Sequence, residues 1–380
     1  MPSVFLGDFP EPDLVEGAPH PRDTASLLGH SQAQADFLTA YNAGRLHHAW
    51  LITGASGVGK ATLAWKIARF LLATPPPDAG GMFGIPPPTT LDIPADHPVQ
   101  RRLTALSEPR LFLLRCGLND TEKAPAQNIL VKEVRALKSY FNLSVADGGR
   151  RVAIVDAVDD LNPNAANALL KLLEEPPPGV TFLLVSHQPA RLLPTIRSRC
   201  RTLRLATLNA GDLSLALTQA GGTLAPADGQ AMAELAGGSV GDAFRLTNQD
   251  GLAVYAALIR LLGTLPRLDR PASLKLAETA AGRGAQSQFD LIVSLVDLFL
   301  ARLARAAATA TTPPDAALQE AALITRLGLP PGAALIWADL AQTLTIRARR
   351  GRAVNLDPAA LLMDMLLKID ETAGSVLAAK

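Results

Sequence analysis

Apolar and polar positions alternate in blocks along the first half of the chain, where short β-rich runs are separated by longer helical patterns. Short runs that are apolar throughout are typical of strands buried on both faces of a sheet. Because helical patterns lie between them, the sequence predicts a parallel sheet covered by helices, which is an α/β fold. The predicted strands are residues 50–53, 111–115, 152–156, 182–186 and 202–205.

Helical periodicity is clearest after the first and third of these strands. Residues 61–72 continue from the first strand and the glycine loop that follows it. After the third strand, Asn162 is a suitable N-cap, Pro163 suits the first turn, and three prolines from Pro176 end the helix. The apolar face of this helix consists of Ala166, Leu169, Leu170 and Leu173.

Beyond Leu205 the strand signal fades and the chain becomes helical and rich in alanine. Ile292, Val296, Phe299 and Leu303 follow the i, i+4, i+7, i+11 spacing of a packed amphipathic helix. A length of 380 residues exceeds that of a usual single domain. The predicted domains are an α/β nucleotide-binding domain over residues 1–206, a small helical lid over 207–250 and an all-α domain over 251–380. We also predict that the Pro- and Gly-rich stretch 74–99 is a mobile loop.

The composition is that of a folded globular protein, with 48% hydrophobic and 19% charged residues. Its 36 basic and 35 acidic residues give a net charge of +1, which argues against a surface that grips nucleic acid over its whole extent. The densest basic cluster consists of Arg347, Arg349, Arg350 and Arg352. We favour a solvated helix end for this cluster over a DNA contact.

Cysteine content and hydropathy bear on the cell compartment. Cys116 and Cys200 lie far apart and belong to no CxxC pair, so the sequence predicts neither a zinc module nor a disulfide framework. The N-terminus has no basic segment followed by an apolar run, and no stretch reaches about 18 uninterrupted apolar residues. We therefore expect a cytoplasmic protein that is not exported and does not enter a membrane.

The loop after the first strand carries a phosphate-binding (Walker A) pattern. In such a loop, glycines let backbone N–H groups surround the phosphates, a lysine reaches the β- and γ-phosphates, and a Ser or Thr hydroxyl holds Mg²⁺. Lys60 is present, but Ala61 occupies the hydroxyl position, and Thr62 is turned by about 100° on a helix. The site is therefore compatible with bound ATP or ADP, but it should hold Mg²⁺ weakly or not at all. The residues expected to contact nucleotide are Gly54, Gly57, Val58, Gly59, Lys60, Ala61 and Thr62.

The third strand has the form of a Walker B strand. Its apolar residues bury it in the sheet, and Asp156 emerges at its end near the expected metal position. Related ATPases place a glutamate next, to polarise the attacking water, whereas this chain has Ala157. Asp159 and Asp160 follow shortly after, but a general base must lie within hydrogen-bond reach of its proton. A second catalytic part is thus absent.

Three further segments make the resemblance to a known family specific. They are residues 45–54 (RLHHAWLITG), 165–177 (AANALLKLLEEPP) and 193–200 (LPTIRSRC). In this order they resemble bacterial clamp-loader subunits of the AAA+ class, which use ATP to load a ring-shaped sliding clamp onto primed DNA. The resemblance implies that Arg199 reaches the ATP site of a neighbouring subunit, where a guanidinium stabilises the charge of phosphoryl transfer. It also implies that Ser186 senses the γ-phosphate. The alternative, that Ser186 is an ordinary hydroxyl at the end of a strand with no such role, is equally open.

Departures from the family pattern narrow the resemblance. Motor subunits carry a zinc-binding cysteine set, an intact Lys-Ser/Thr pair, an Asp-Glu pair at Walker B and an arginine in a Gly-Ser-x-Arg pattern. This chain lacks those cysteines and has Ala61, Ala157 and Gly241 at the other three positions. These losses favour the delta-prime type of subunit, a stator of the DNA polymerase III clamp loader that does not hydrolyse ATP. The implied partners are the motor (gamma/tau) and delta subunits, the sliding clamp, and primer-template DNA held through the assembly, with residues 251–380 as a collar domain.

Two alternatives stay open. An active motor subunit of the same loader would need Thr62 and Asp159 or Asp160 to rescue catalysis. A stand-alone P-loop kinase or NTPase would use Asp92 and Asp96 to bind a substrate, but this hypothesis leaves the triplet around Arg199 and the C-terminal helices unexplained.

Overall fold

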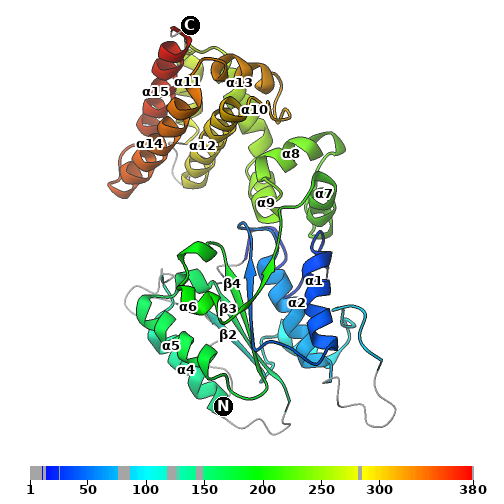
Figure 1. Cartoon of the computed structure of the whole chain (residues 1–380). Helices are drawn as coiled ribbons and strands as arrows, with labels where there is room; N and C mark the ends of the chain where they lie inside the picture. Colours follow the sequence, from blue (N-terminus) through cyan, green and yellow to red (C-terminus); the bar gives the residue numbers. More distant parts are fainter. Residues whose placement is uncertain are drawn as a thin grey trace. The chain divides into compact units, whose positions relative to one another are not determined.

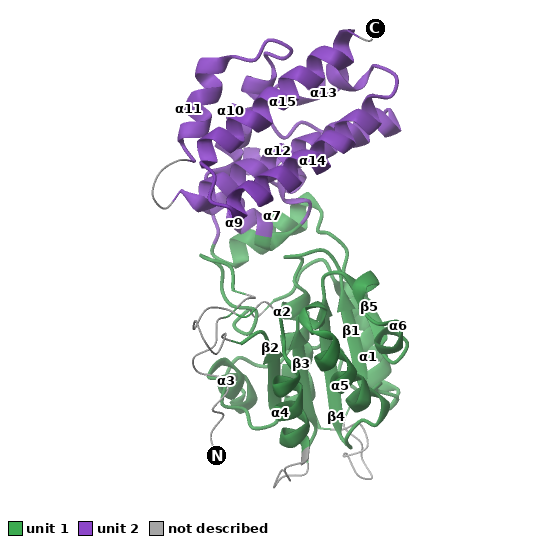
Figure 2. Cartoon of the chain, turned by 90° about the vertical axis from the view of Figure 1, so that its left-hand side faces the viewer, with its two compact units in different colours: residues 1–221, 239–241 green, residues 222–238, 242–380 purple. Residues whose placement is uncertain are grey.

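A computed structural model describes residues 11, 14–24, 26–75, 86–117, 126, 128–142, 149–280 and 285–378. The chain forms two compact units, which Figure 2 shows in separate colours. Unit 1 comprises residues 1–221 and 239–241, and unit 2 comprises residues 222–238 and 242–380. The three domain ranges stated above stay predictions.

Unit 1 contains a five-stranded parallel sheet in the order β2-β3-β4-β1-β5. Its strands are β1 (Ala49–Thr53), β2 (Leu111–Arg115), β3 (Arg151–Asp156), β4 (Val180–Ser186) and β5 (Arg201–Arg204). The predicted strands and the α/β class are confirmed, with strand ends that differ by no more than two residues.

Helices cover both faces of this sheet (Figure 1). The helices of this part of the chain are α1 (Ser31–Asn42), α2 (Lys60–Ala73), α3 (Pro98–Thr104), α4 (Val131–Asn142), α5 (Pro163–Glu174) and α6 (Pro194–Arg197). Helix α7 (Ala210–Gln219) also belongs to unit 1 but, in the described part of the chain, contributes no residue to the core on either face of the sheet. Trp50 and Ile52 of β1 pack with α1 and α2, while Leu51 packs with α4 and α5. Successive residues of a strand point to opposite faces, so a strand covered on both faces must be apolar throughout.

The predicted helix signals after the first and third strands are confirmed. Helix α2 begins at Lys60, directly after Gly59. Gly59 has a φ of 99°, a left-handed backbone conformation that glycine adopts without steric cost. Helix α5 is capped by Asn162, whose side-chain oxygen accepts from the backbone N–H of Ala165 at 2.8 Å. Pro163 occupies the first turn, where its missing N–H costs nothing.

Part of the predicted loop at 74–99 lies outside the described residues, namely residues 76–85. Residues 86–97 form neither helix nor strand, although Leu91 is buried in the core beside α2. The Asp92 carboxylate pairs with the Lys66 ammonium of α2 at 2.7 Å. This anchored part of the stretch thus packs against the fold, and mobility elsewhere in it stays a prediction.

The described part of unit 2 is helical. Its helices are α8 (Gly229–Ala236), α9 (Val240–Asn248, whose first two residues group with unit 1), α10 (Gly251–Leu262), α11 (Arg270–Glu278), α12 (Gln286–Thr309), α13 (Glu320–Gly328), α14 (Ala333–Ala353) and α15 (Pro358–Ala378). The long helices α12 and α14 pack side by side (Figure 1). The predicted apolar stripe from Ile292 to Leu303 is buried on α12.

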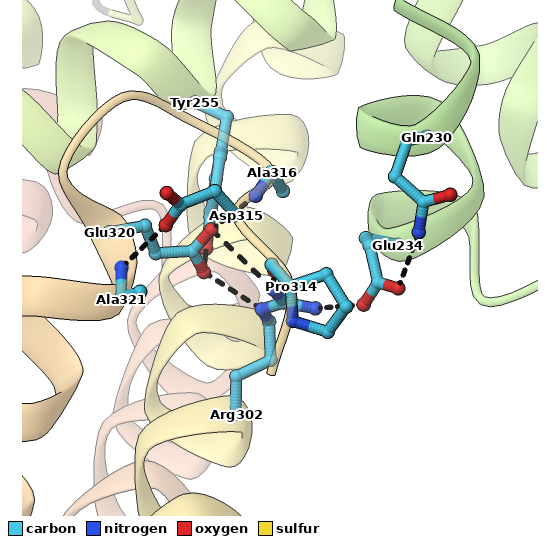
Figure 3. A network of polar contacts seen from close by, with 9 residues as sticks. All are labelled: Gln230, Glu234, Tyr255, Arg302, Pro314, Asp315, Ala316, Glu320 and Ala321. Carbon is cyan, nitrogen blue, oxygen red and sulfur yellow. Dashed lines mark hydrogen bonds and ion pairs between the residues drawn. The ribbon is translucent and has the colours of Figure 1, made fainter. Parts of the chain in front are cut away.

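A buried polar network joins four helices of unit 2 (Figure 3). The Arg302 guanidinium on α12 contacts Glu320 at the start of α13 and Glu234 on α8, each at 2.8 Å. Glu320 also accepts from the Tyr255 hydroxyl on α10 at 2.6 Å. Burial opposes the charge on Arg302, but its bonds to Glu234 and Glu320 outweigh this and raise the Arg302 pKa. Helix α8 is therefore tied to α12 by an ion pair and does not rely on apolar contacts alone.

Within the described ranges, no single helix is long and apolar enough to cross a membrane. Only α13 and α14 taken together pass that test by length and composition, and they are bent by 111°.

Candidate functional site

The phosphate-binding pattern folds as a loop between the carboxyl end of β1 and the amino end of α2. Gly57 has a φ of 69°, and a Cβ there would lie 2.2 Å from the Ser239 hydroxyl and 3.0 Å from the Gly241 nitrogen. The Gly241 N–H donates to the Gly57 carbonyl at 3.2 Å. The loop therefore needs glycine both for its backbone conformation and for close contact with residues 239–241.

The Lys60 side chain is withdrawn into this loop. Its ammonium donates to the Ala55 carbonyl, and the residue is only 3% exposed. Burial lowers the pKa of Lys60 to about 8, against the opposing effect of the negative charges of Asp156 and Asp159. Lys60 and both carboxylates therefore belong to one electrostatic cluster, as expected for the end of a Walker A and Walker B pair.

The register of the sheet brings the remaining predicted nucleotide residues to the same edge. Thr53 pairs with Ser186, and Asp156 pairs with Val185, so β1, β3 and β4 end together next to the loop. Asp156 is buried at the end of β3. The carboxyl ends of parallel strands are where α/β sheets bind ligands.

The metal-ligand position lacks an oxygen. Ala61 is the second residue of α2, and the half-buried Thr62 is the third, so their side chains leave the helix about 100° apart. Thr62 therefore does not take the place of the hydroxyl that Ala61 lacks. Val58 is buried, and its carbonyl accepts a hydrogen bond from His30 Nε2 at 2.7 Å.

The carboxylates after Ala157 are engaged elsewhere. Asp159 accepts from the Ser186 hydroxyl at 2.8 Å, from the His187 N–H, and from the Gln188 N–H at 3.3 Å. It thus binds the turn that follows β4. The Ser186 hydroxyl thus orients Asp159, and a role for Ser186 in sensing a γ-phosphate stays a prediction.

Asp160 lies on the other side of the turn. Its carboxylate is 3.9 Å from the Cys116 sulfur, and burial, followed by the Asp159 charge, raises its pKa. Burial also raises the pKa of the Cys116 thiol to about 11, which leaves it protonated at neutral pH. Both carboxylates therefore have partners within unit 1, and neither directly follows Asp156 in the chain.

Two histidines of the site could not be found from the sequence. His30 is buried beside the loop, and burial lowers its pKa. His187 is exposed as a whole, yet partial burial of its ring and the positive charge of Lys60 lower its pKa. Neither histidine belongs to a spacing motif, so only the fold reveals that His30 contacts the loop at Val58 and that His187 lies near Lys60.

Arg199 lies in a different part of unit 1. It follows α6, and its side chain is 35% exposed. The guanidinium donates to the Thr195 carbonyl at 3.0 Å and pairs with the Glu174 carboxylate at 2.8 Å. No pattern in the sequence predicts that Glu174, the last residue of α5, is the partner of Arg199.

The sheet separates Arg199 from the phosphate-binding loop. Arg201, the first residue of β5, pairs with Trp50 near the start of β1, whereas the loop begins after Thr53. Strands rise about 3.3 Å per residue, so the five residues of β1 separate the two edges by about 13 Å. Arg199 lies at the amino edge and Lys60 at the carboxyl edge, and Arg199 is therefore remote from its own chain's loop.

Other predicted candidates are bound within their own units. Arg347 pairs with Asp364 at 2.8 Å, and the Arg352 guanidinium lies 5.2 Å from the centre of the Phe289 ring. Arg349 and Arg352 share a pocket of about 580 Å³ with acidic side chains, among them Asp290 and Asp297. These contacts are compatible with the predicted solvated helix end, which stays a prediction. Asp92, invoked for a kinase, is already paired with Lys66.

Comparison with known proteins agrees with this geometry. The profile of a family described as "DNA polymerase III, delta subunit" matches residues 96–209. DNA polymerase III subunit delta' of Pseudomonas aeruginosa is 39% identical over 153 residues, which are 40% of this chain and 41% of that protein. Over these matched residues the chain is similar to clamp-loader subunits of DNA polymerase III. The predicted α/β domain with a phosphate-binding loop and a helical C-terminal part agrees with unit 1 and unit 2.

Members of both branches of this clamp-loader family match the chain. DNA polymerase III subunit tau of Salmonella typhimurium is 29% identical over 281 residues, which are 72% of this chain and 40% of that protein. The chain thus spans about two fifths of the length of these curated relatives. Among solved structures, a gamma-subunit-related protein from Thermotoga maritima has a TM-score of 0.39 and 17% identity, covering 89% of this chain and 100% of its own.

Proposed function

We propose that this chain is a clamp-loader subunit, a stator of the delta-prime type, which does not hydrolyse ATP and donates Arg199 to a neighbouring subunit. The observation that carries the proposal is the division of unit 1 into two edges. The carboxyl edge keeps Lys60 and Asp156 but has Ala61 and Ala157 where hydrolysis needs a metal ligand and a base. The amino edge keeps an exposed arginine.

The residues around the loop suit a phosphate group better than a magnesium nucleotide. The glycine conformations and Lys60 are those of a phosphate cradle, and Gly54, Gly57, Val58, Gly59 and Lys60 would hold the phosphates of ATP or ADP. No side-chain oxygen is present at Ala61 to hold Mg²⁺. In this chain such a nucleotide would therefore support the structure and not be turned over.

In the proposed assembly, Arg199 acts on ATP held by a motor (gamma/tau) subunit. During hydrolysis a water oxygen forms a bond to the γ-phosphorus while the bond to the β–γ bridging oxygen breaks, giving ADP and phosphate. Negative charge spreads over the transferred phosphoryl oxygens, and a guanidinium beside them stabilises it. The delta subunit, the sliding clamp and primer-template DNA are the other proposed partners, and all would be met in the cytoplasm.

A reconstituted loader tests the role of Arg199. Arg199→Ala should abolish most turnover at the one site that it serves, because arginine fingers contribute about 10³- to 10⁵-fold in rate. The DNA-stimulated ATPase rate of the assembly should therefore fall by the fraction of the total rate that this one ATP site contributes. Arg197→Ala, on the same exposed segment, is the control and should leave the rate near wild type. An unchanged rate with Arg199→Ala would remove the proposed role.

The motor-subunit alternative is tested on the purified chain. Without its partners, the chain should show no Mg²⁺-dependent ATP hydrolysis above background. Turnover that disappears in Lys60→Ala would identify an active site in this chain and refute the stator proposal.

A further inference from the structure

Glu174, the partner of Arg199, lies at the C-terminal end of a helix, where an acidic side chain is ordinarily unfavourable. Glu174 is the last residue of α5 and Glu175 follows it as the C-cap. The carbonyl end of a helix carries partial negative charge, so acidic side chains there are unfavourable. An unfavourable residue at such a position suggests a compensating interaction, and the ion pair between Glu174 and Arg199 supplies it.

The last turn of α5 is held firmly. The His48 ring bonds to the Leu173 carbonyl at 3.0 Å, and Leu173 itself is buried in the core on this face of the sheet. Burial, and then the charge of the adjacent His47, lower the pKa of His48, so the ring is neutral near pH 7. The backbone that carries Glu174 is thus fixed from the segment that leads into β1.

The contacts of Arg199 hold its guanidinium in place but do not use all of its N–H donors. One terminal nitrogen, Nη1, donates to the Thr195 carbonyl at 3.0 Å and approaches the Ser198 hydroxyl at 3.5 Å. The other, Nη2, pairs with Glu174 at 2.8 Å. A guanidinium has five N–H donors, and these contacts use three of them. Two donors therefore stay available for a phosphate oxygen.

We infer that Glu174 is a positioning residue for Arg199, a role that rests on the proposed function. A long arginine side chain on the surface samples many rotamers, and ordering it opposes binding. Glu174 and the Thr195 carbonyl order the side chain before the neighbour arrives. Both members of the pair are more than one-third exposed, and water weakens an ion pair of this kind. Glu174 thus orients Arg199 without binding it too tightly to serve a phosphate.

The test compares Glu174→Gln with Glu175→Gln in the reconstituted loader. Each variant removes one negative charge from the end of α5, but only Glu174 pairs with Arg199. We expect Glu174→Gln to lower kcat for DNA-stimulated hydrolysis about two- to fivefold at the affected site, the size of an exposed ion pair. The KM for ATP should stay unchanged, because the arginine acts on the transition state. Glu174→Asp should recover part of kcat, and Glu175→Gln should behave as wild type.

A double variant separates this inference from the function on which it rests. If Glu174 acts through Arg199, the pair Glu174→Gln and Arg199→Ala should be no slower than Arg199→Ala alone. An effect of Arg199→Ala without any effect of Glu174→Gln would overturn the positioning role and leave the proposed function intact. A higher kcat in Glu174→Gln would also overturn it, since Glu174 would then sequester the arginine. No effect of Arg199→Ala would remove the proposed function itself.

Discussion

Substitution of Glu320 by alanine should destabilise unit 2 more than any change on its surface. Glu320 is fully buried and accepts from four donor groups (Figure 3). These are the Tyr255 hydroxyl at 2.6 Å, the Ala316 N–H at 2.7 Å, and Arg302 Nε and Nη2 at 2.8 and 3.5 Å. The substitution deletes the acceptor and leaves these donors in place.

The size of the stability loss depends on the buried Arg302 charge that remains after Glu320 is removed. Removing one partner of a buried ion pair costs about 3–5 kcal/mol, because the other charge stays buried without compensation. Arg302 keeps Glu234, whose side chain is 23% exposed, and this places the expected loss of stability near the lower limit, at about 3 kcal/mol. At 1.4 kcal/mol per tenfold change, such a loss corresponds to about a 100-fold higher population of locally opened states.

Hydrogen exchange of the full chain, followed by mass spectrometry, measures this change locally. Amides of α10, α12 and α13 should exchange about 100-fold faster in Glu320→Ala, while those of β1, β3 and β4 in unit 1 should be unchanged. Glu371→Ala is the matched control, because Glu371 is 68% exposed in its pair with Lys368. An exposed pair of this kind contributes at most about 1 kcal/mol.

A second comparison tests the physical cause. Replacing Arg302 by Met together with Glu320 by Leu removes both charges, so the loss should be smaller than the sum of the single losses by at least about 1 kcal/mol. If Glu320→Ala accelerates exchange in α12 less than about fivefold, or if the two losses simply add, the network does not stabilise unit 2 as argued.

Two further predictions concern the phosphate-binding loop. Gly57→Ala should lower the thermal stability of unit 1 by about 2 kcal/mol or more, since its Cβ would lie 2.2 Å from the Ser239 hydroxyl in a left-handed conformation. Gly44 has a similar φ of 65°, but a Cβ there would have no atom within 4 Å, so Gly44→Ala should lower the free energy of unfolding by only about 1 kcal/mol. Equal losses in the two variants would contradict the steric argument. The pKa of Lys60 is lowered from 10.5 to about 8, so between these pH values the unfolded chain binds more protons than the folded one, and stability rises with pH. In urea unfolding, the stability of wild type relative to Lys60→Met should therefore rise by roughly 2 kcal/mol from pH 7.5 to pH 9.5, and a constant difference would refute this.

The sequence predicts the sheet well because its strands are buried on both faces. Apolar runs such as residues 152–156 leave few other options, and the loop before Lys60 needs a strand before it and a helix after it. The cap at Asn162 is likewise a local signal, and the structure confirms it at 2.8 Å. Local signals and burial patterns thus account for the elements and their order along the chain.

Contacts between distant segments could not be predicted in the same way. The bond from Ser186 to Asp159 joins the end of β4 to the turn after β3, and the pair of Arg199 with Glu174 joins the turn after α6 to the end of α5. Both depend on the strand order β2-β3-β4-β1-β5, which hydrophobic periodicity does not encode. The sequence showed which catalytic parts are missing, but not that Asp159 is committed to the turn after β4.

The two edges of the sheet show how the proposed loss of hydrolysis and the proposed role of Arg199 in trans would be compatible in one domain. Ala61 and Ala157 lie at the carboxyl edge, and Glu174 and Arg199 lie at the amino edge, about 13 Å away along β1. Sites at this separation with no shared partners act nearly independently, within about 0.5 kcal/mol. The effects of Gly57→Ala and Arg199→Ala on the stability of unit 1 should therefore add. The same independence means that changes around Lys60 need not disturb the arginine, because the rigid sheet between them is stabilised by its own apolar core.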